Sequence, residues 1–237
     1  MTPTSRRDFI ERAALSSFGL AATLPGGLSS ARLAGSRRSN SSFLDLRRPP
    51  DLVIAQTANG NRELEHVATE RWTGDGGILV TSAPRSDALR VTLSAPAAGV
   101  KRLYLRWRAD IADTRLIVGD AWERAYGDLE WRGWVPDRVM PWYFATNDGA
   151  VTHAYGVGTG ARAFCYWQAD PHGISLCADV RSGSAAVQLG ERTLDVCDVV
   201  CREGRAGESA FAALHAFCRE LCSKPRLPSQ PVYGSND

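Results

Sequence analysis

The chain has 237 residues, and its 28 lysines and arginines against 26 aspartates and glutamates give a formal net charge of +2 at pH 7. No basic stretch is interleaved with aromatic residues, so the pattern expected of a nucleic-acid-binding protein is missing. Seven tryptophans, six tyrosines and 22 glycines are typical of a β-protein with tight turns and aromatic surfaces.

Residues 1–42 have the composition of an export signal and a polar linker. The segment 5–9 (SRRDF) precedes an uncharged stretch at 13–24, the pattern of a twin-arginine signal. That stretch holds about a dozen apolar residues where a membrane span needs roughly 20, so no membrane anchor is predicted. We expect Arg6 and Arg7 to direct export to the periplasm or the cell exterior, with cleavage between Ala31 and Ser42.

Residues 43–207 are predicted to form one large antiparallel β-sandwich. Leu103, Leu105 and Trp107 alternate with polar or aromatic neighbours, which places one face of a strand on a core and the other toward solvent. Turn sequences separate about ten such runs, and no helical pattern intervenes. The other runs are 77–82, 88–94, 115–118, 139–145, 150–157, 161–168, 174–180, 185–189 and 193–202.

Residues 208–224 are predicted to form one connecting helix that begins near Ser209. Prolines at 225 and 228 end it, and 225–237 reads as a linker and the start of a further element. Apolar residues recur at intervals of three and four and predict a single apolar stripe. The stripe comprises Phe211, Leu214, Phe217, Cys218 and Leu221.

Residues 119–131 (GDAWERAYGDLEW) and 233–237 (YGSND) resemble melibiase-type α-galactosidases, family 36-like glycoside hydrolases of clan D. The resemblance covers about 44–237 and implies a β-sandwich ahead of a (β/α)₈ barrel that is missing here. The family's first barrel strand carries Asn-x-Trp near the galactose pocket, and Asn236 and Asp237 match its first two positions. Both catalytic carboxylates of the family lie later in the barrel, so the resemblance implies no catalytic residue in this chain.

Acidic and aromatic residues crowd together between 120 and 143. A catalytic carboxyl pair would need two acids about 5–10 Å apart, but interleaved arginines favour an ion-paired loop instead. The acids considered for such a pair are Asp120, Glu123, Asp128, Glu130 and Asp137. Aromatic rings beside carboxylates suit sugars, whereas aromatics in strands mostly fill cores. We expect Trp142 and Phe144 to point inward, and Trp122 and Trp131 to lie on an edge loop. The candidate substrate-binding residues are Asp120, Trp122, Glu123 and Trp131, with Asn236 and Asp237 added by the resemblance.

No metal or other cofactor is predicted. Cys197 and Cys201 lie on a strand pattern, where four residues span about 13 Å, too far for one zinc ion. The four histidines share no metal-ligand spacing. Disulfides formed after export and small buried thiols both remain open. The cysteines are Cys165, Cys177, Cys197, Cys201, Cys218 and Cys222.

Three functions follow from these patterns. The first is the non-catalytic sandwich module of an exported α-galactosidase-like enzyme, which shapes the substrate entrance or the assembly and acts on galactoside-type carbohydrate through the barrel. The second is a stand-alone carbohydrate-binding sandwich. The third is a nonfunctional truncated gene product. The sequence does not give the oligomeric state, and a homo-oligomer stays open because family enzymes often assemble through this domain.

Overall fold

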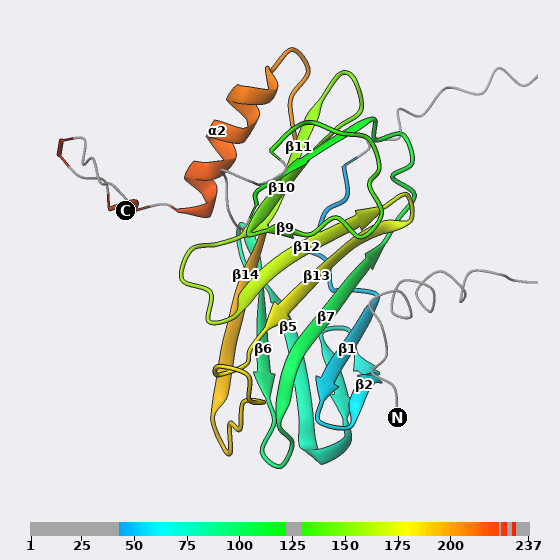
Figure 1. The fold of residues 1–237 in the computed structure, drawn as a ribbon, viewed down its shortest axis with the longest axis vertical. Helices are drawn as coiled ribbons and strands as arrows, with labels where there is room; N and C mark the ends of the chain where they lie inside the picture. The colour runs from blue at the N-terminus through cyan, green and yellow to red at the C-terminus, as the bar shows by residue number, and fades with distance from the viewer. Residues whose placement is uncertain (1–42, 122–128, 223, 227–228, 231–237) are drawn as a thin grey trace, which may run out of the picture.

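The computed structural model describes residues 43–121, 129–222, 224–226 and 229–230. Two large antiparallel sheets pack against each other in this part of the chain, and an α-helix follows them (Figure 1). The predicted mainly β class, with a sandwich and one helix near the C-terminal end, is confirmed for the described residues.

One sheet has six strands, in the spatial order β2-β1-β7-β13-β12-β9. Its long central strands pair with partners that are distant in sequence, so the sheet brings the start and the second half of the domain together. The strands are β1 (Leu52–Thr57), β2 (Gly60–Glu63), β7 (Val100–Arg108), β9 (Met140–Pro141), β12 (Phe164–Asp170) and β13 (Gly173–Asp179).

The other sheet has eight strands, in the order β3-β4-β5-β6-β14-β11-β10-β8. A short 3₁₀ turn, η1 (Asp75–Gly77), joins β4 to β5. The strands are β3 (Glu65–Ala68), β4 (Arg71–Gly74), β5 (Ile78–Pro84), β6 (Ala88–Ser94), β8 (Leu116–Gly119), β10 (Tyr143–Asn147), β11 (Thr152–Val157) and β14 (Thr193–Arg202).

Aromatic rings from both sheets form the centre of the core. Trp107 and Trp167 come from the six-stranded sheet, and their ring centroids lie 6.4 Å apart. Phe144 of the eight-stranded sheet lies 5.7 Å from Trp167 and stacks on Tyr155 at 5.0 Å. All four are buried, so these rings hold the two sheets together.

The strand predictions hold best where apolar and polar residues alternate. Leu103, Leu105 and Trp107 point into the core as expected. Four strands, β1 to β4, precede the first run that the sequence predicted. The expected strand at 185–189 is wrong, since this segment makes only the isolated bridges of Val187 with Val100 and of Ala185 with Ser182. Small residues there offer little side chain to pack on a sheet.

The prediction that Trp142 points inward is wrong, whereas Phe144 is buried as expected. Trp142 lies where the chain passes from β9 in one sheet to β10 in the other. Its N–H donates to the carbonyl of Cys165 at 3.1 Å, and its carbonyl accepts from the N–H of Val157 at 3.0 Å and from Nε1 of Trp167 at 3.1 Å. These bonds hold φ at +63°, and the side chain is 39% exposed.

Helix α2 (Ala210–Leu221) begins as predicted, with Ser209 as the N-cap whose hydroxyl accepts from the N–H of Ala212. Its predicted stripe is only partly right. Phe217 is buried, but Phe211 is 80% exposed and Cys218 is also exposed, because Ala213 takes the inward position instead. In the part of the chain that the structure describes, no helix is long and apolar enough to cross a membrane.

Candidate functional site

Residues 120–131, here called the edge loop, leave the sandwich at the outermost strand of the eight-stranded sheet. The loop follows β8 and ends beside it, because Ile117 and Arg132 exchange two backbone hydrogen bonds of 2.6 and 3.0 Å. The guanidinium of Arg138 donates to the carbonyls of Ile117 at 2.9 Å and Glu130 at 3.2 Å. Surface loops held at both ends by a rigid sheet are a common place for functional residues.

Asp120 and Trp131 are the two candidate residues of the edge loop that the structure describes. Asp120 is only 7% exposed, and its N–H donates to the carbonyl of Tyr143 at 3.2 Å, which extends the pairing of β8 with β10. Trp131 is half-buried. Asp120 is therefore fixed at the base of the loop, and Trp131 lies where the loop returns to the sheet.

Trp131 belongs to a second apolar cluster, on the outer face of the eight-stranded sheet. This cluster is separate from the main core and includes the inward face of α2. Its buried members are Ala88, Ala145, Ala154, Val200 and Phe217, and its half-buried members are Val118, Trp131, Tyr143, Leu214 and Leu221. Trp131, where the loop returns to the sheet, and α2 thus pack on one surface, although they are far apart in sequence.

Helix α2 lies close to β11 because that strand carries a glycine under it. A Cβ atom on Gly156 would fall 3.0 Å from Cδ2 of Leu221 and 3.1 Å from the ring of Phe217. At its C-terminal end, the carbonyl of Leu221 accepts from the N–H of Thr159 at 2.9 Å. The helix is therefore fixed to the sheet by close packing and by a hydrogen bond to the β11–β12 turn.

Arg202, at the end of β14, braces the helix on its other side. Its guanidinium donates to both carboxylate oxygens of Glu208, at 2.7 and 2.9 Å, and lies 3.4 Å from Oε1 of Glu220. The hydrogen bonds from Arg202 lower the pKa of Glu208, while burial raises that of Glu220. The Arg202 guanidinium thus connects Glu208, which precedes the N-cap of α2, to Glu220 in the last turn of the helix.

The remaining sequence candidates divide into two groups. Glu130 and Asp137 are exposed, and Glu130 lies 3.3 Å from Arg132, an ion pair of the kind predicted for a solvated loop. The others lie outside the described residues: Arg6, Arg7, Trp122, Glu123, Asp128, Asn236 and Asp237.

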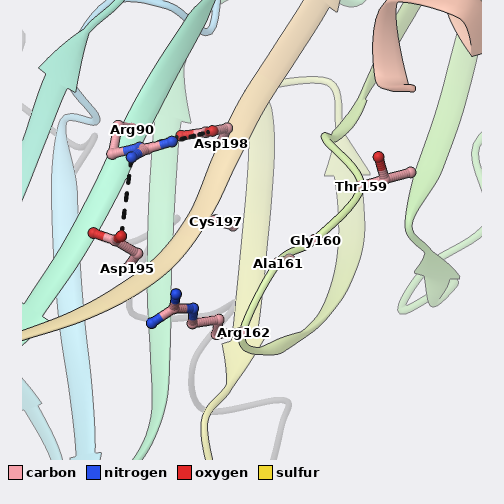
Figure 2. A pocket seen from close by; sticks show the side chains of 8 residues that line it. All are labelled: Arg90, Thr159, Gly160, Ala161, Arg162, Asp195, Cys197 and Asp198. Atoms are coloured by element: carbon pink, nitrogen blue, oxygen red, sulfur yellow. Dashed lines mark hydrogen bonds and ion pairs between the residues drawn. The ribbon is translucent and has the colours of Figure 1, made fainter. Parts of the chain in front are cut away.

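A shallow polar pocket of about 190 Å³ lies beyond α2 on the same sheet face (Figure 2). Arg90 donates to both carboxylate oxygens of Asp198 at 2.7 Å and lies 3.9 Å from Asp195. These hydrogen bonds to Asp198 hold the pKa of the Arg90 guanidinium above its usual value. Because both carboxylate oxygens of Asp198 accept hydrogen bonds from Arg90, we interpret the pocket as an ion-paired surface. Asp195 and Asp198 are therefore not assigned as a catalytic carboxyl pair.

A β-bulge explains how two acids of one strand reach this pocket. The register of β14 against β6 shifts between Asp195 and Cys197, so Val196 and Cys197 both point into the core. Asp195 and Asp198 then share the outer face. The sequence could not reveal this arrangement, because Arg90 and Asp198 are 108 positions apart.

All six cysteines are free in the structure, and four of them are buried. A hydrogen bond with Cys197, together with burial, raises the pKa of Cys165 well above its usual value. Burial raises the pKa of Cys177 and of Cys201 to about 12. These thiols therefore stay protonated at neutral pH, which suits a packing role. Among the described residues, no group of three or more histidine, cysteine or acidic side chains could hold a metal ion.

No family model, no curated protein and no solved structure matches the chain. The resemblance of residues 119–131 and 233–237 and the twin-arginine pattern therefore stay predictions from the sequence. The structure adds that Trp131 and α2 pack against one cluster on the outer face of the eight-stranded sheet.

Proposed function

We propose that this chain is the non-catalytic β-sandwich module of an exported α-galactosidase-like glycoside hydrolase. The observation that carries the proposal is that Trp131 packs against the cluster of buried residues that also contains Phe217 of α2. The loop that resembles the family and the helix that precedes the family-like residues 233–237 thus share one face. A barrel that follows α2 would meet the edge loop there.

Exposed apolar side chains support docking on this side. Leu129 in the edge loop, Leu116 and Val135 on either side of it in sequence, and Phe211 on α2 are all large and exposed. Exposed apolar side chains are frequent at interfaces with another domain. We assign these side chains to the contact with the barrel or with a second subunit.

The role of the module is to shape the substrate entrance. Asp120, Trp122, Glu123 and Trp131 would contribute an aromatic and acidic wall beside a galactoside pocket, and Asn236 and Asp237 would lie at the first barrel strand. Retaining hydrolysis by two barrel carboxylates, one a nucleophile and the other an acid/base, would be the chemistry of the complete enzyme. None of those steps falls to a residue of this chain.

Hydrolysis of 4-nitrophenyl α-galactoside tests the proposal. The 237-residue chain should release no 4-nitrophenol, whereas the chain continued through its downstream reading frame should do so. In the continued chain, Trp131→Ala should lower kcat/KM, whereas Val67→Ala, an exposed change on β3 at the opposite edge of the eight-stranded sheet, should leave it unchanged. If deleting the whole sandwich left kcat/KM and solubility unchanged, the module would have no part in the enzyme.

Export is the second element of this proposal. Arg6→Lys combined with Arg7→Lys keeps the charge of the signal but removes the arginine pair. We expect cell fractionation to show the double variant in the cytoplasm and the natural sequence in the periplasm or the medium. Undiminished export of the variant would contradict a twin-arginine route.

A further inference from the structure

An exposed aromatic pair lies where the six-stranded sheet meets its neighbour. Trp142 and Phe164 meet edge to face, with ring centroids 5.4 Å apart and an interplanar angle of 84°. They are 39% and 44% exposed. Two large rings that remain exposed side by side form the kind of apolar patch that marks a binding surface.

The backbone of Trp142 has a conformation that is unusual for a residue with a bulky side chain. Its φ of +63° lies in the left-handed region, which is unfavourable for a bulky side chain. A glycine there could make the same backbone hydrogen bonds without strain. Strain retained under an exposed aromatic ring is typical of ligand-contacting positions. The positive φ of Trp142 therefore lowers the stability of the fold relative to a glycine at this position.

A row of planar polar groups continues from Phe164 across the outer face of the sheet. The strand register places Phe164 beside Asp179, then Arg102, Gln56 and Asn61 on successive strands. With strands about 4.8 Å apart, this cross-strand row extends over about 19 Å. It is long enough to contact several units of a short oligomer.

Hydrogen bonds fix the row before any ligand binds. Arg102 donates to Asp179 at 2.9 Å and to the Gln56 side chain at 3.1 Å, and Gln56 donates to Asn61 at 3.1 Å. Arg181 donates to the same carboxylate of Asp179 at 2.6 Å. Burial opposes the charge of Asp179, yet the bonds from Arg181 and Arg102 outweigh it and lower its pKa. Preorganised groups lose little entropy when they bind a ligand.

We propose that the Trp142–Phe164 pair and the cross-strand row form a binding surface for a neutral oligosaccharide. Sugar rings offer apolar C–H faces to aromatic rings and hydroxyl groups to carboxylate, guanidinium and amide groups. The charged residues of the row argue against the core of a protein interface. Asp179 between Arg102 and Arg181 also interrupts the positive surface that a phosphate backbone requires.

This surface lies on the six-stranded sheet, whereas the edge loop and α2 lie on the eight-stranded one. The inference therefore does not depend on the proposed hydrolase module. Oligosaccharide binding is measured with the isolated chain. The hydrolase proposal is tested separately, by the hydrolysis of a galactoside by the continued chain.

Affinity electrophoresis of the purified chain tests the inference, in native gels that contain galactomannan, xylan or mixed-linkage β-glucan. At least one polysaccharide should retard the natural chain. Trp142→Gly and Phe164→Ala should each weaken binding by about tenfold or more. Phe211→Ala is the matched control, because it removes an exposed aromatic ring from α2. It should bind like the natural chain.

Thermal unfolding of the variants separates binding from folding. Trp142→Gly should melt at or near the temperature of the natural chain, because glycine tolerates the positive φ. Loss of binding by a fully folded variant would support the proposal. The proposal would be overturned if none of the three polysaccharides retarded the natural chain, or if Trp142→Gly bound as tightly. Conversion of a dimer to a monomer by Trp142→Gly, without any sugar binding, would assign the surface to a second copy.

Discussion

Gly156 of β11 and Phe217 of α2 are so close that a Cβ atom on the glycine would lie 3.1 Å from the phenylalanine ring. This relationship sets the position of α2 on the outer face of the eight-stranded sheet. Because Trp131 packs against the same cluster, the end of the edge loop and the helix lie on one surface. The proposed docking surface depends on this close approach.

Gly156→Val should displace the helix. Overpacking a tight contact costs about 1–3 kcal/mol, and urea unfolding should show a loss of free energy of unfolding in that range. Gly158→Ala is the control, since its added Cβ would meet its nearest atoms at an ordinary 3.7 Å. An equal loss in both variants would mean that the contact with Phe217 does not determine the helix position.

Arg202→Met should loosen α2 without unfolding the sandwich. It removes the cation that joins Glu208 to Glu220 while keeping a long apolar side chain. Hydrogen exchange should become faster in the amides of α2 and remain unchanged in the central strands. Arg132→Met removes an exposed ion pair and should leave exchange in α2 unaltered. Unchanged hydrogen exchange in the Arg202→Met variant would show that Arg202 does not stabilise the position of α2.

His153 should make stability depend on pH. Burial lowers its pKa, and its Nδ1 accepts from the N–H of Gly204 at 3.1 Å. Below pH about 6.5, the unfolded chain binds a proton at this residue that the folded chain does not. The free energy of unfolding should therefore fall as the pH drops from 7 toward the folded pKa of His153.

His153→Gln provides the comparison, because an amide oxygen can still accept from Gly204 but does not titrate. Its stability should change less between pH 7 and 5 than that of the natural chain. His172→Gln alters an exposed histidine, and its free energy of unfolding should depend on pH as it does in the natural chain. If the free energy of unfolding of His153→Gln fell by as much as that of the natural chain, another group would be responsible.

Thiol labelling should follow the burial of the cysteines. Cys218 is exposed and should react with a maleimide in the native protein, and Cys222 should react more slowly. The four buried cysteines should react only after denaturation, because burial keeps the reagent away from them. The raised pKa values of Cys165, Cys177 and Cys201 slow the reaction of these three further. Mass spectrometry counts the labels in both states. Fewer than six labels on the denatured chain without reductant would show that disulfides form after export.

The class of each element could be predicted where one physical pattern dominates. Leu103, Leu105 and Trp107 alternate because one face of β7 meets the core, and Ser209 begins α2 because its hydroxyl accepts a free N–H. The buried face of α2 was less certain. Helix α2 packs closely on Gly156 through Phe217, and Phe211 stays exposed. The apolar periodicity of the helix does not show which of the two phenylalanines is buried.

The candidate site was predictable only in part. The motif drew attention to Asp120 and Trp131, and the structure shows where both lie. The sequence could not reveal the outward position of Trp142, because this position depends on backbone hydrogen bonds with Cys165 and Val157 across the sheet junction. The partnership of Arg90 with Asp198 depends on strand pairing and on a bulge, so local sequence carries no sign of it.

Nucleotide sequencing of the source genome across the codon for Asp237 is the most direct test of the proposed hydrolase module. We expect a tryptophan codon to follow, which completes Asn-x-Trp from Asn236, and several hundred further bases to encode alternating strands and helices of a barrel. A shifted frame with the same content would still identify a hydrolase module. A stop codon followed by unrelated sequence would contradict the hydrolase assignment and leave the sandwich as the whole gene product.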